Sequence, residues 1–198
     1  MTHTKEKNFN GNDFNKLLHM IRTERKGVKI FADTCFLLRG EYDFVRNLYS
    51  PMKSHNVLYP NNPVFIYITD SMYHELVKSS RSTDVSLAQR ASFMLEIIDL
   101  ELKAEDGVFK EYRNGIGGLF YDLDVLSISI QEKYYSSLIV LTQDRKLSRD
   151  LILVNSMESA GGNTIHVCYA DNRSWHLEEG TIPGSVEKQE LTVSEFAH

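Results

Sequence analysis

Carboxylates recur where the apolar runs of this sequence end. Asp33 follows VKIFA directly, and Asp144 follows LIVLT after a single residue. Glu75 stands one helical turn beyond VFIYIT, and Asp124 opens the segment that leads to the last of these runs. Like charges held a few Å apart destabilise a fold unless a counter-charge joins them. A hard divalent cation with oxygen ligands is the usual remedy. The four residues therefore indicate a carboxylate-held metal ion.

A single acidic residue at such a point carries little information, because Asp is a common helix cap. The signal lies in four of them arriving from separate pieces of chain. Asp122 and Asp124 lie two residues apart, so on a helix they point to nearly opposite sides. We favour Asp124 as the ligand and Asp122 as the cap.

The elements that must position these residues alternate along the chain. Each strand is a short run rich in β-branched and apolar residues, and each helix shows apolar residues at helical spacing. Asp70 or Ser71 can cap the helix that carries Glu75. Residues 106–118, which contain several glycines, are expected to form a loop. One expected strand ends at Asp33, and the others span 64–69, 136–142 and 163–170. The expected helices span 13–26, 41–52, 72–79, 84–103, 122–135 and 144–156.

Strands separated by helices predict a three-layer α/β/α sandwich around a central, mainly parallel sheet. In such sheets, ligands bind beyond the carboxyl ends of the strands. All four acidic positions are expected at that edge. We divide the chain into an N-terminal helical extension (1–27), the main domain (28–171) and a C-terminal extension or tail (172–198).

With these acidic residues in this order, the chain resembles the PIN-domain family of metal-dependent nucleases. The family pattern begins with a strand ending in Asp and a small hydroxyl residue, continues with a Glu after the second strand and an Asp opening a helix, and closes with T-x-D-x-x-L after a strand. The match runs in the right order over roughly residues 28 to 170. The matching segments are IFADTCFLL with Asp33 and Thr34, ITDSMYHELV with Glu75, DLDVLSISI with Asp124, and IVLTQDRKL with Thr142, Asp144 and Leu147.

The resemblance implies a PIN-like fold and a divalent-metal-dependent endoribonuclease that cuts single-stranded RNA. Asp33, Asp124 and Asp144 would hold Mg²⁺ or Mn²⁺, which suit carboxylate ligands. Glu75 would more readily orient a metal-bound water than coordinate directly. The family also makes a homodimer and a regulatory protein or antitoxin possible partners.

Substrate phosphates need hydrogen-bond donors near the metal. Arg145 and Lys146 start a helix, whose free N–H groups also favour anions. Arg39 follows the first motif. Taken singly, each is more often a solvated surface charge. Thr34 and Thr142 can hydrogen-bond a carboxylate or a phosphate, and ordinary strand-end capping is an equal alternative.

The composition excludes some classes of protein. The formal net charge of −5 and the isoelectric point near 5.8 argue against a general nucleic-acid binder held by bulk positive charge. Cys35 and Cys168 lack metal-ligand spacing and are expected to be buried thiols in a reducing cytoplasm. No apolar run approaches the length that spans a bilayer, and the first residues lack the apolar stretch of a secretory signal.

Two other functions compete with the nuclease. A haloacid-dehalogenase-type phosphatase needs a second Asp two residues after the first, where this chain has Cys35. A catalytically inactive PIN-like scaffold that binds RNA or protein is the main alternative. The presence of all four acidic residues favours the enzyme over the scaffold.

Overall fold

The computed structural model describes residues 13–24, 27–39, 43–113, 121–157, 163–170 and 175–178. A single sheet runs through this part of the chain, in the strand order β3-β2-β1-β4-β5-β6. The first five of its strands pair in parallel, and β6 pairs antiparallel with β5. The strands are β1 (Val28–Ala32), β2 (Ile66–Ile68), β3 (Phe109–Glu111), β4 (Ser137–Leu141), β5 (Ile165–Ala170) and β6 (Trp175–Glu178).

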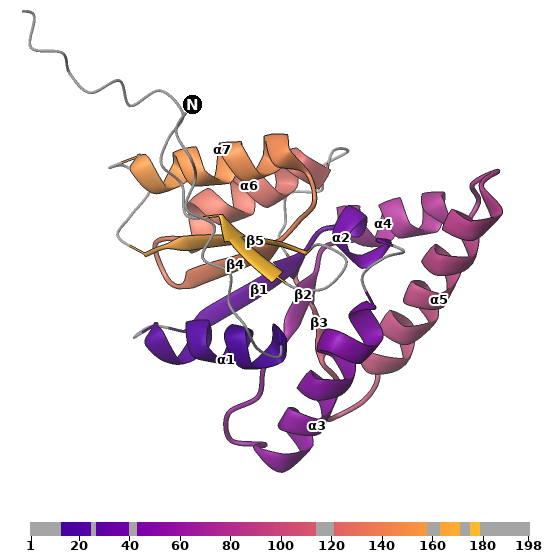
Figure 1. The fold of residues 1–198 in the computed structure, drawn as a ribbon, viewed down its shortest axis with the longest axis horizontal. Coiled ribbons are helices and arrows are strands. Elements are labelled where there is room, and N and C mark those ends of the chain that lie inside the picture. The colour runs from indigo at the N-terminus through magenta and orange to yellow at the C-terminus, as the bar shows by residue number, and fades with distance from the viewer. Residues whose placement is uncertain are drawn as a thin grey trace, which may run out of the picture.

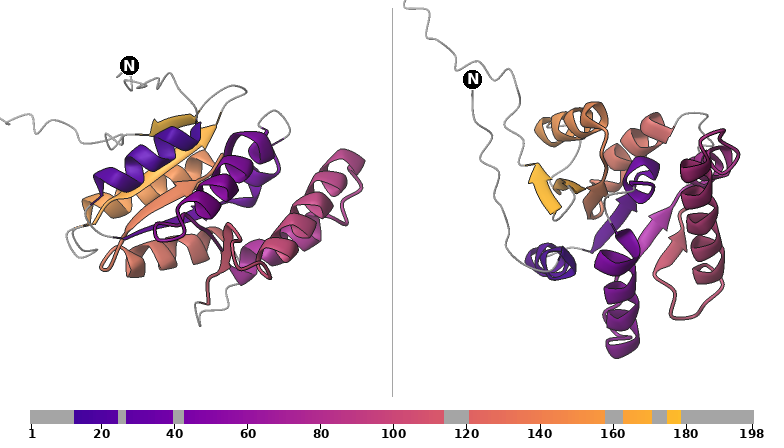
Figure 2. Two further views of the ribbon diagram at one scale, coloured as in Figure 1. Left: turned by 90° about the horizontal axis from the view of Figure 1, so that it is seen from below. Right: turned by 45° about the vertical axis from the view of Figure 1, so that its right-hand side comes forward.

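Helices cover both faces of this sheet, which confirms the expected three-layer α/β sandwich (Figure 1). Helices α6 and α7 lie together on one side, and α1 and α3 lie on the other (Figures 1 and 2). Helix α5 packs along α4, which also contacts α6. The helical elements are α1 (Asp13–Thr23), α2 (Thr34–Leu37), the π-helical turn η1 (Val45–Tyr49), α3 (Ser50–Leu58), α4 (Asp70–Ser79), α5 (Val85–Glu101), α6 (Tyr121–Glu132) and α7 (Arg145–Ser156).

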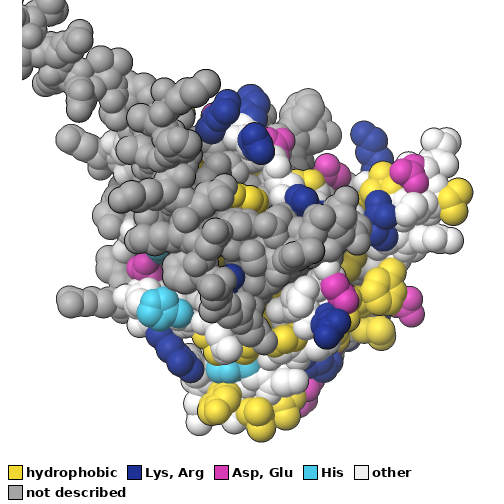
Figure 3. Space-filling model, in the orientation of Figure 1, with side chains coloured by type: hydrophobic (Ala, Val, Ile, Leu, Met, Phe, Trp, Pro, Cys, Tyr) yellow, Lys and Arg dark blue, Asp and Glu magenta, His cyan; other side chains and the backbone are white. Residues whose placement is uncertain are grey.

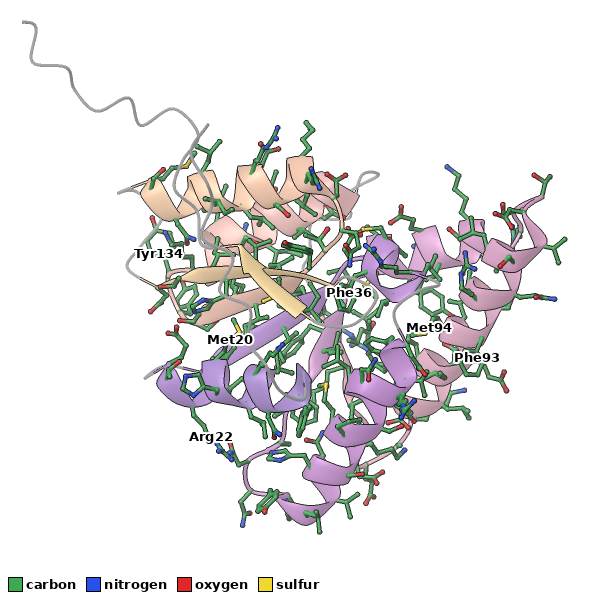
Figure 4. The ribbon with its side chains drawn as sticks, viewed as in Figure 1. Met20, Arg22, Phe36, Phe93, Met94 and Tyr134 are labelled. Atoms are coloured by element: carbon green, nitrogen blue, oxygen red, sulfur yellow. The ribbon has the colours of Figure 1, made fainter. Side chains whose placement is uncertain are left out.

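The apolar periodicity of the sequence explains which faces are buried. Every residue of β4 is buried, as expected for a central parallel strand with helices on both faces. In α5 the neighbours Met94 and Phe93 differ in burial: Met94 is 3% exposed and Phe93 53% exposed (Figure 4). Phe36, in the short helix α2, is fully buried, and it anchors the chain directly after β1.

The expected helix over 41–52 continues further than predicted, through the π-helical turn η1 and on to Leu58. Residues 41 and 42 lie outside the described part of the chain, and the helical conformation begins after Asp43. Pro51 stands at the junction and has no N–H to donate to the carbonyl four residues earlier. The turn-like residues that follow Met52 belong partly to α3, which ends at Leu58.

Three other expectations need correction. The helix carrying Glu75 is capped by Thr69, whose hydroxyl accepts from the Met72 N–H, and not by Asp70 or Ser71. The expected loop over 106–118 contains β3, which pairs with β2. Gly107 makes the turn before β3 possible, because a Cβ there would lie 2.0 Å from the Glu101 carbonyl oxygen. No strand was expected beyond residue 170, yet residues 175–178 of the C-terminal extension or tail form β6.

No helix in the ranges given above is both long and apolar enough to cross a membrane.

Candidate functional site

The candidate site lies where the sheet changes its direction of growth. From β1 the chain adds β2 and then β3 on one side, while β4 and β5 lie on the other side of β1. The carboxyl ends of β1 and β4 are therefore neighbours at a topological switch point, where ligands of open α/β sheets bind. The Asp33 N–H donates to the Leu141 carbonyl at 2.7 Å, so pairing of the two strands continues to this point.

Asp33 stands at the centre of a hydrogen-bond network. Its carboxylate is 4% exposed and does not cap α2, so capping does not explain this residue. The Thr142 hydroxyl donates to Oδ2 at 2.6 Å, and the Cys35 thiol donates to the same oxygen at 2.6 Å. The Thr34 hydroxyl lies 3.4 Å from Oδ1. All of these donors are neutral groups.

Thr34 lies between Asp33 and Glu75. The Thr34 hydroxyl donates to Oε2 of Glu75, which projects from α4. Thr34 is buried whereas Glu75 is exposed. Two of the four expected acidic residues thus lie near the same hydroxyl, whose single proton goes to Glu75, although they are 42 residues apart in sequence (75 − 33).

Asp144 caps α7, as the capping alternative predicts. Its Oδ1 accepts from the Lys146 N–H at 2.6 Å and from the Leu147 N–H at 3.0 Å. The Asp144 N–H donates to the Thr142 hydroxyl at 3.0 Å. Since Thr142 also donates to Asp33, it connects the two aspartates across the ends of β1 and β4.

Asp124 differs from the other three acidic residues. It lies in the first turn of α6, is 8% exposed, and makes no side-chain hydrogen bond or ion pair within the described part of the chain. Helix α6 leads into the amino end of β4, so its first turn lies toward the carboxyl edge of the sheet. Asp122 also lies within α6, whose described helix begins at Tyr121, and its side chain is outside the described residues.

The donor chemistry of this edge fits a hard divalent cation. The carboxylates offer only oxygen ligands, and burying a carboxylate without a partner is costly. Asp124 is such a carboxylate. However, nowhere in the described ranges do three or more His, Cys, Asp or Glu residues come together in an arrangement that could hold a metal ion. Carboxylate ligands are therefore present at this edge, but the described residues do not bring three of them together around one point.

Cys35 was expected to be buried in apolar surroundings, and this was wrong. The residue is exposed, and its sulfur lies between the Asp33 carboxylate and the Gln143 N–H, which donates to it at 3.3 Å. Although the residue as a whole is exposed, its sulfur is largely desolvated; this desolvation and the charge of Asp33 raise the pKa of the thiol to about 12, so it stays protonated and donates. Cys168 is buried, as expected.

The expected phosphate-binding residues surround this edge on separate elements. Arg145 and Lys146 are exposed on α7, and Lys and Arg side chains lie over this helix at the top of the view in Figure 3. Two N–H groups at the start of α7 already donate to Asp144, so anion binding there would depend mainly on the side chains. Arg39 lies at the end of α2 and donates from Nη1 to Oε1 of Gln143 at 2.7 Å.

Thr34 and Thr142 each donate to a carboxylate in the structure. Both are buried and hydrogen-bond carboxylates, so they are placed to position acidic groups. Gln143 was missed by the sequence analysis. The only signal it offered was its place between Thr142 and Asp144, in a motif where the intervening residue has no prescribed type.

No protein-family model matches the chain, and a search of curated proteins finds no match. We therefore infer the function from the residues at the carboxyl edge of the sheet.

Proposed function

We propose that this chain is a divalent-metal-dependent endoribonuclease that hydrolyses phosphodiester bonds of single-stranded RNA. The observation that carries the proposal is a pair of buried carboxylates, Asp33 and Asp124, with no cationic side chain paired to either within the described ranges. Both are expected at the edge of the sheet where α/β proteins bind ligands. A cation from solution is the partner that these groups lack.

In this proposal Asp33, Asp124 and Asp144 hold Mg²⁺ or Mn²⁺. The bound ion would lower the pKa of a coordinated water and neutralise charge on the scissile phosphate. Thr142 holds the Asp33 carboxylate in place, and Thr34 holds Glu75 beside it. Glu75 is the group suited to orienting the attacking water. Arg39, Arg145 and Lys146 would hold phosphates of the RNA.

The alternative is a catalytically inactive PIN-like scaffold that binds RNA or protein. One observation favours it: the carboxylates of the described residues are not gathered into a metal-binding group. The two readings differ in whether a divalent ion binds at all, so metal binding and RNA cleavage must be measured together.

The test is cleavage of a 5′-labelled single-stranded RNA with Mn²⁺ or Mg²⁺, with metal binding followed by calorimetry. The variants are Asp33→Asn, Asp124→Asn and Asp144→Asn. Asn is itself a good helix cap, so Asp144→Asn removes the charge while keeping the start of α7. Asp150→Asn, on the same helix and half-buried, is the matched control.

We expect each of the three variants to lose activity by roughly a thousandfold or more, since the water can no longer be activated. Asp150→Asn should cut like the wild type. Absence of both cutting and metal binding in the wild type would reject the nuclease and favour the scaffold. Cutting that survives Asp33→Asn would place the active site elsewhere.

A cytoplasmic location, a homodimer and a regulatory protein or antitoxin remain part of the proposal. The location follows from the two free cysteines, and the two partners follow from the family resemblance.

A further inference from the structure

The buried Asp33 carboxylate is held mainly by one of its two oxygens. Oδ2 accepts from the Thr142 hydroxyl and from the Cys35 thiol, each at 2.6 Å. The Thr34 hydroxyl lies 3.4 Å from Oδ1, but its single proton goes to Glu75. Oδ1 therefore receives no short hydrogen bond from the residues that the structure describes. Two neutral donors orient the carboxylate and leave one of its oxygens for a further partner.

Both donors connect the ends of β1 and β4. Cys35 lies in α2, directly after β1, and its sulfur accepts from the Gln143 N–H at 3.3 Å. Gln143 and Thr142 follow β4. The sulfur is therefore held from one strand end while its own proton is donated to the carboxylate at the other. Because both donors depend on the pairing of β1 with β4, this pairing fixes the orientation of Asp33.

Asp144 shows the same division between its two oxygens. Its Oδ1 accepts from the Lys146 and Leu147 N–H groups, whereas Oδ2 accepts no hydrogen bond from the described part of the chain. Carboxylates that bind metal ions are themselves held by hydrogen bonds, which orient them toward the ion. In both aspartates, then, one oxygen is held by the protein and the other is available to a ligand.

We propose that Cys35 is a positioning residue of the metal site: with Thr142 it holds Oδ2 of Asp33, so that Oδ1 is the oxygen that binds the divalent ion. The thiol acts through Asp33 as a hydrogen-bond donor and is not itself a ligand. A hard cation suits this assignment, because such ions take oxygen ligands whereas sulfur suits softer metals. The presence of the ion rests on the proposed function.

The first test measures the hydrogen bond of the thiol without metal. The infrared S–H stretching bands of the full chain in EDTA are assigned with Cys35→Ala and Cys168→Ala, since these are its two free cysteines. We expect the Cys35 band at lower frequency than the Cys168 band, because its acceptor is charged. In Asp33→Asn, whose amide oxygen is neutral, the band should move back. Equal frequencies for the two thiols in the wild type would overturn the proposal.

The second test follows Mn²⁺ binding by calorimetry. We expect Cys35→Ala to bind Mn²⁺ about tenfold more weakly, as is usual when a group that holds a metal ligand is removed. Cys35→Ser keeps a donor and should recover binding to within about threefold of the wild type. Cys168→Ala removes the other thiol and is the matched control. Wild-type affinity in Cys35→Ala, or no recovery in Cys35→Ser, would overturn the positioning role.

Cadmium distinguishes a donor from a ligand. Thiolate sulfur prefers soft metal ions, and a bond between cadmium and sulfur gives charge-transfer absorption in the ultraviolet. We expect no such band when the wild type is mixed with equimolar Cd²⁺. A band that disappears in Cys35→Ser would make the sulfur a metal ligand and would overturn its role as a donor.

Cleavage of labelled RNA with Mn²⁺ separates the positioning role from the proposed function. If the wild type cuts RNA and Cys35→Ala keeps wild-type Mn²⁺ affinity, the positioning role fails while the nuclease stands. If Mn²⁺ binds with the expected dependence on residue 35 and RNA is never cut, the nuclease fails while the positioning role stands. If the wild type does not bind Mn²⁺ at all, both are rejected.

Discussion

Two buried carboxylates of this protein have the same exposure and very different surroundings. Glu101, at the end of α5, and Asp33, at the end of β1, are each 4% exposed. Glu101 forms an ion pair with Lys53, accepts from the Tyr49 hydroxyl at 2.8 Å and accepts from the Val108 N–H at 3.1 Å. Within the described residues, Asp33 receives hydrogen bonds only from the Thr142 hydroxyl and the Cys35 thiol, while the Thr34 hydroxyl lies 3.4 Å from it and donates to Glu75.

The difference separates a structural carboxylate from a candidate functional one. Burial raises the pKa of Glu101, but the hydrogen bonds from Lys53, Tyr49 and Val108 outweigh it, and the pKa lies below its usual value. The charge of Glu101 is therefore balanced by the protein itself, where it joins α5 to η1 and α3. Within the described residues, the charge of Asp33 has only neutral donors around it and no side-chain cation to balance it.

The largest expected effect comes from changing each carboxylate to its amide. We expect Glu101→Gln to lower the free energy of unfolding by about 3 kcal/mol, because its NH₂ would face the fixed Val108 N–H or the Lys53 ammonium group. Asp33→Asn should change the free energy of unfolding by less than about 1 kcal/mol. The new NH₂ group can take the place of Oδ1, which makes no strong hydrogen bond, and can donate to the Thr34 hydroxyl oxygen. Urea unfolding measures both. Equal losses would remove the distinction between the two residues.

Divalent metal should distinguish the same residues in the opposite sense. At a hundredfold excess of Mn²⁺ over its dissociation constant, the wild type should gain about 2.7 kcal/mol of stability. Glu101→Gln should keep this gain, and Asp33→Asn should lose it, because only Asp33 is proposed as a ligand. Thermal or urea unfolding with and without Mn²⁺ provides the measurement. A gain that persists in Asp33→Asn would move the metal site away from β1.

Acid should reduce the contribution of Glu101. A carboxyl group whose folded pKa is lowered contributes stability that is present above its ordinary value of 4.5 and is lost as the pH falls through the folded pKa. The stability gap between the wild type and Glu101→Gln should therefore be full at pH 7 and narrow progressively below pH 4.5. Urea midpoints across this range test the expectation. A gap that stays constant down to acid pH would contradict the role of the charge.

The smallest effect concerns Ser129, which shows that a partnerless polar atom need not mark a site. Its hydroxyl is fully buried in α6 and has no hydrogen-bond partner among the residues that the structure describes. Ser129→Ala should raise the free energy of unfolding by up to about 1 kcal/mol, because a desolvated hydroxyl is removed at little cost in volume. RNA cleavage should be unchanged. Loss of cleavage would extend the functional region into α6.

Local patterns predicted the strands near Asp33 and Thr142 because both lie where a buried apolar run ends. The strand β3 was missed because three residues next to Gly107 carry too short a pattern, and pairing with β2 is what orders them. The capping of α4 by Thr69 was missed because several residues there have side chains able to cap. Which of them caps the helix depends on where the strand stops.

By itself, the sequence determined the alternation of strands and helices and the acidic residues at the ends of the apolar runs, since burial dictates both patterns. Only the tertiary structure decided that β1 lies between β2 and β4, because strand order depends on packing across the whole sheet. That order brings Thr142 to Asp33, Glu75 to Thr34 and Gln143 to Arg39. It also leaves Cys35 exposed beside a carboxylate, because the short helix α2 turns its apolar residues inward and this one outward.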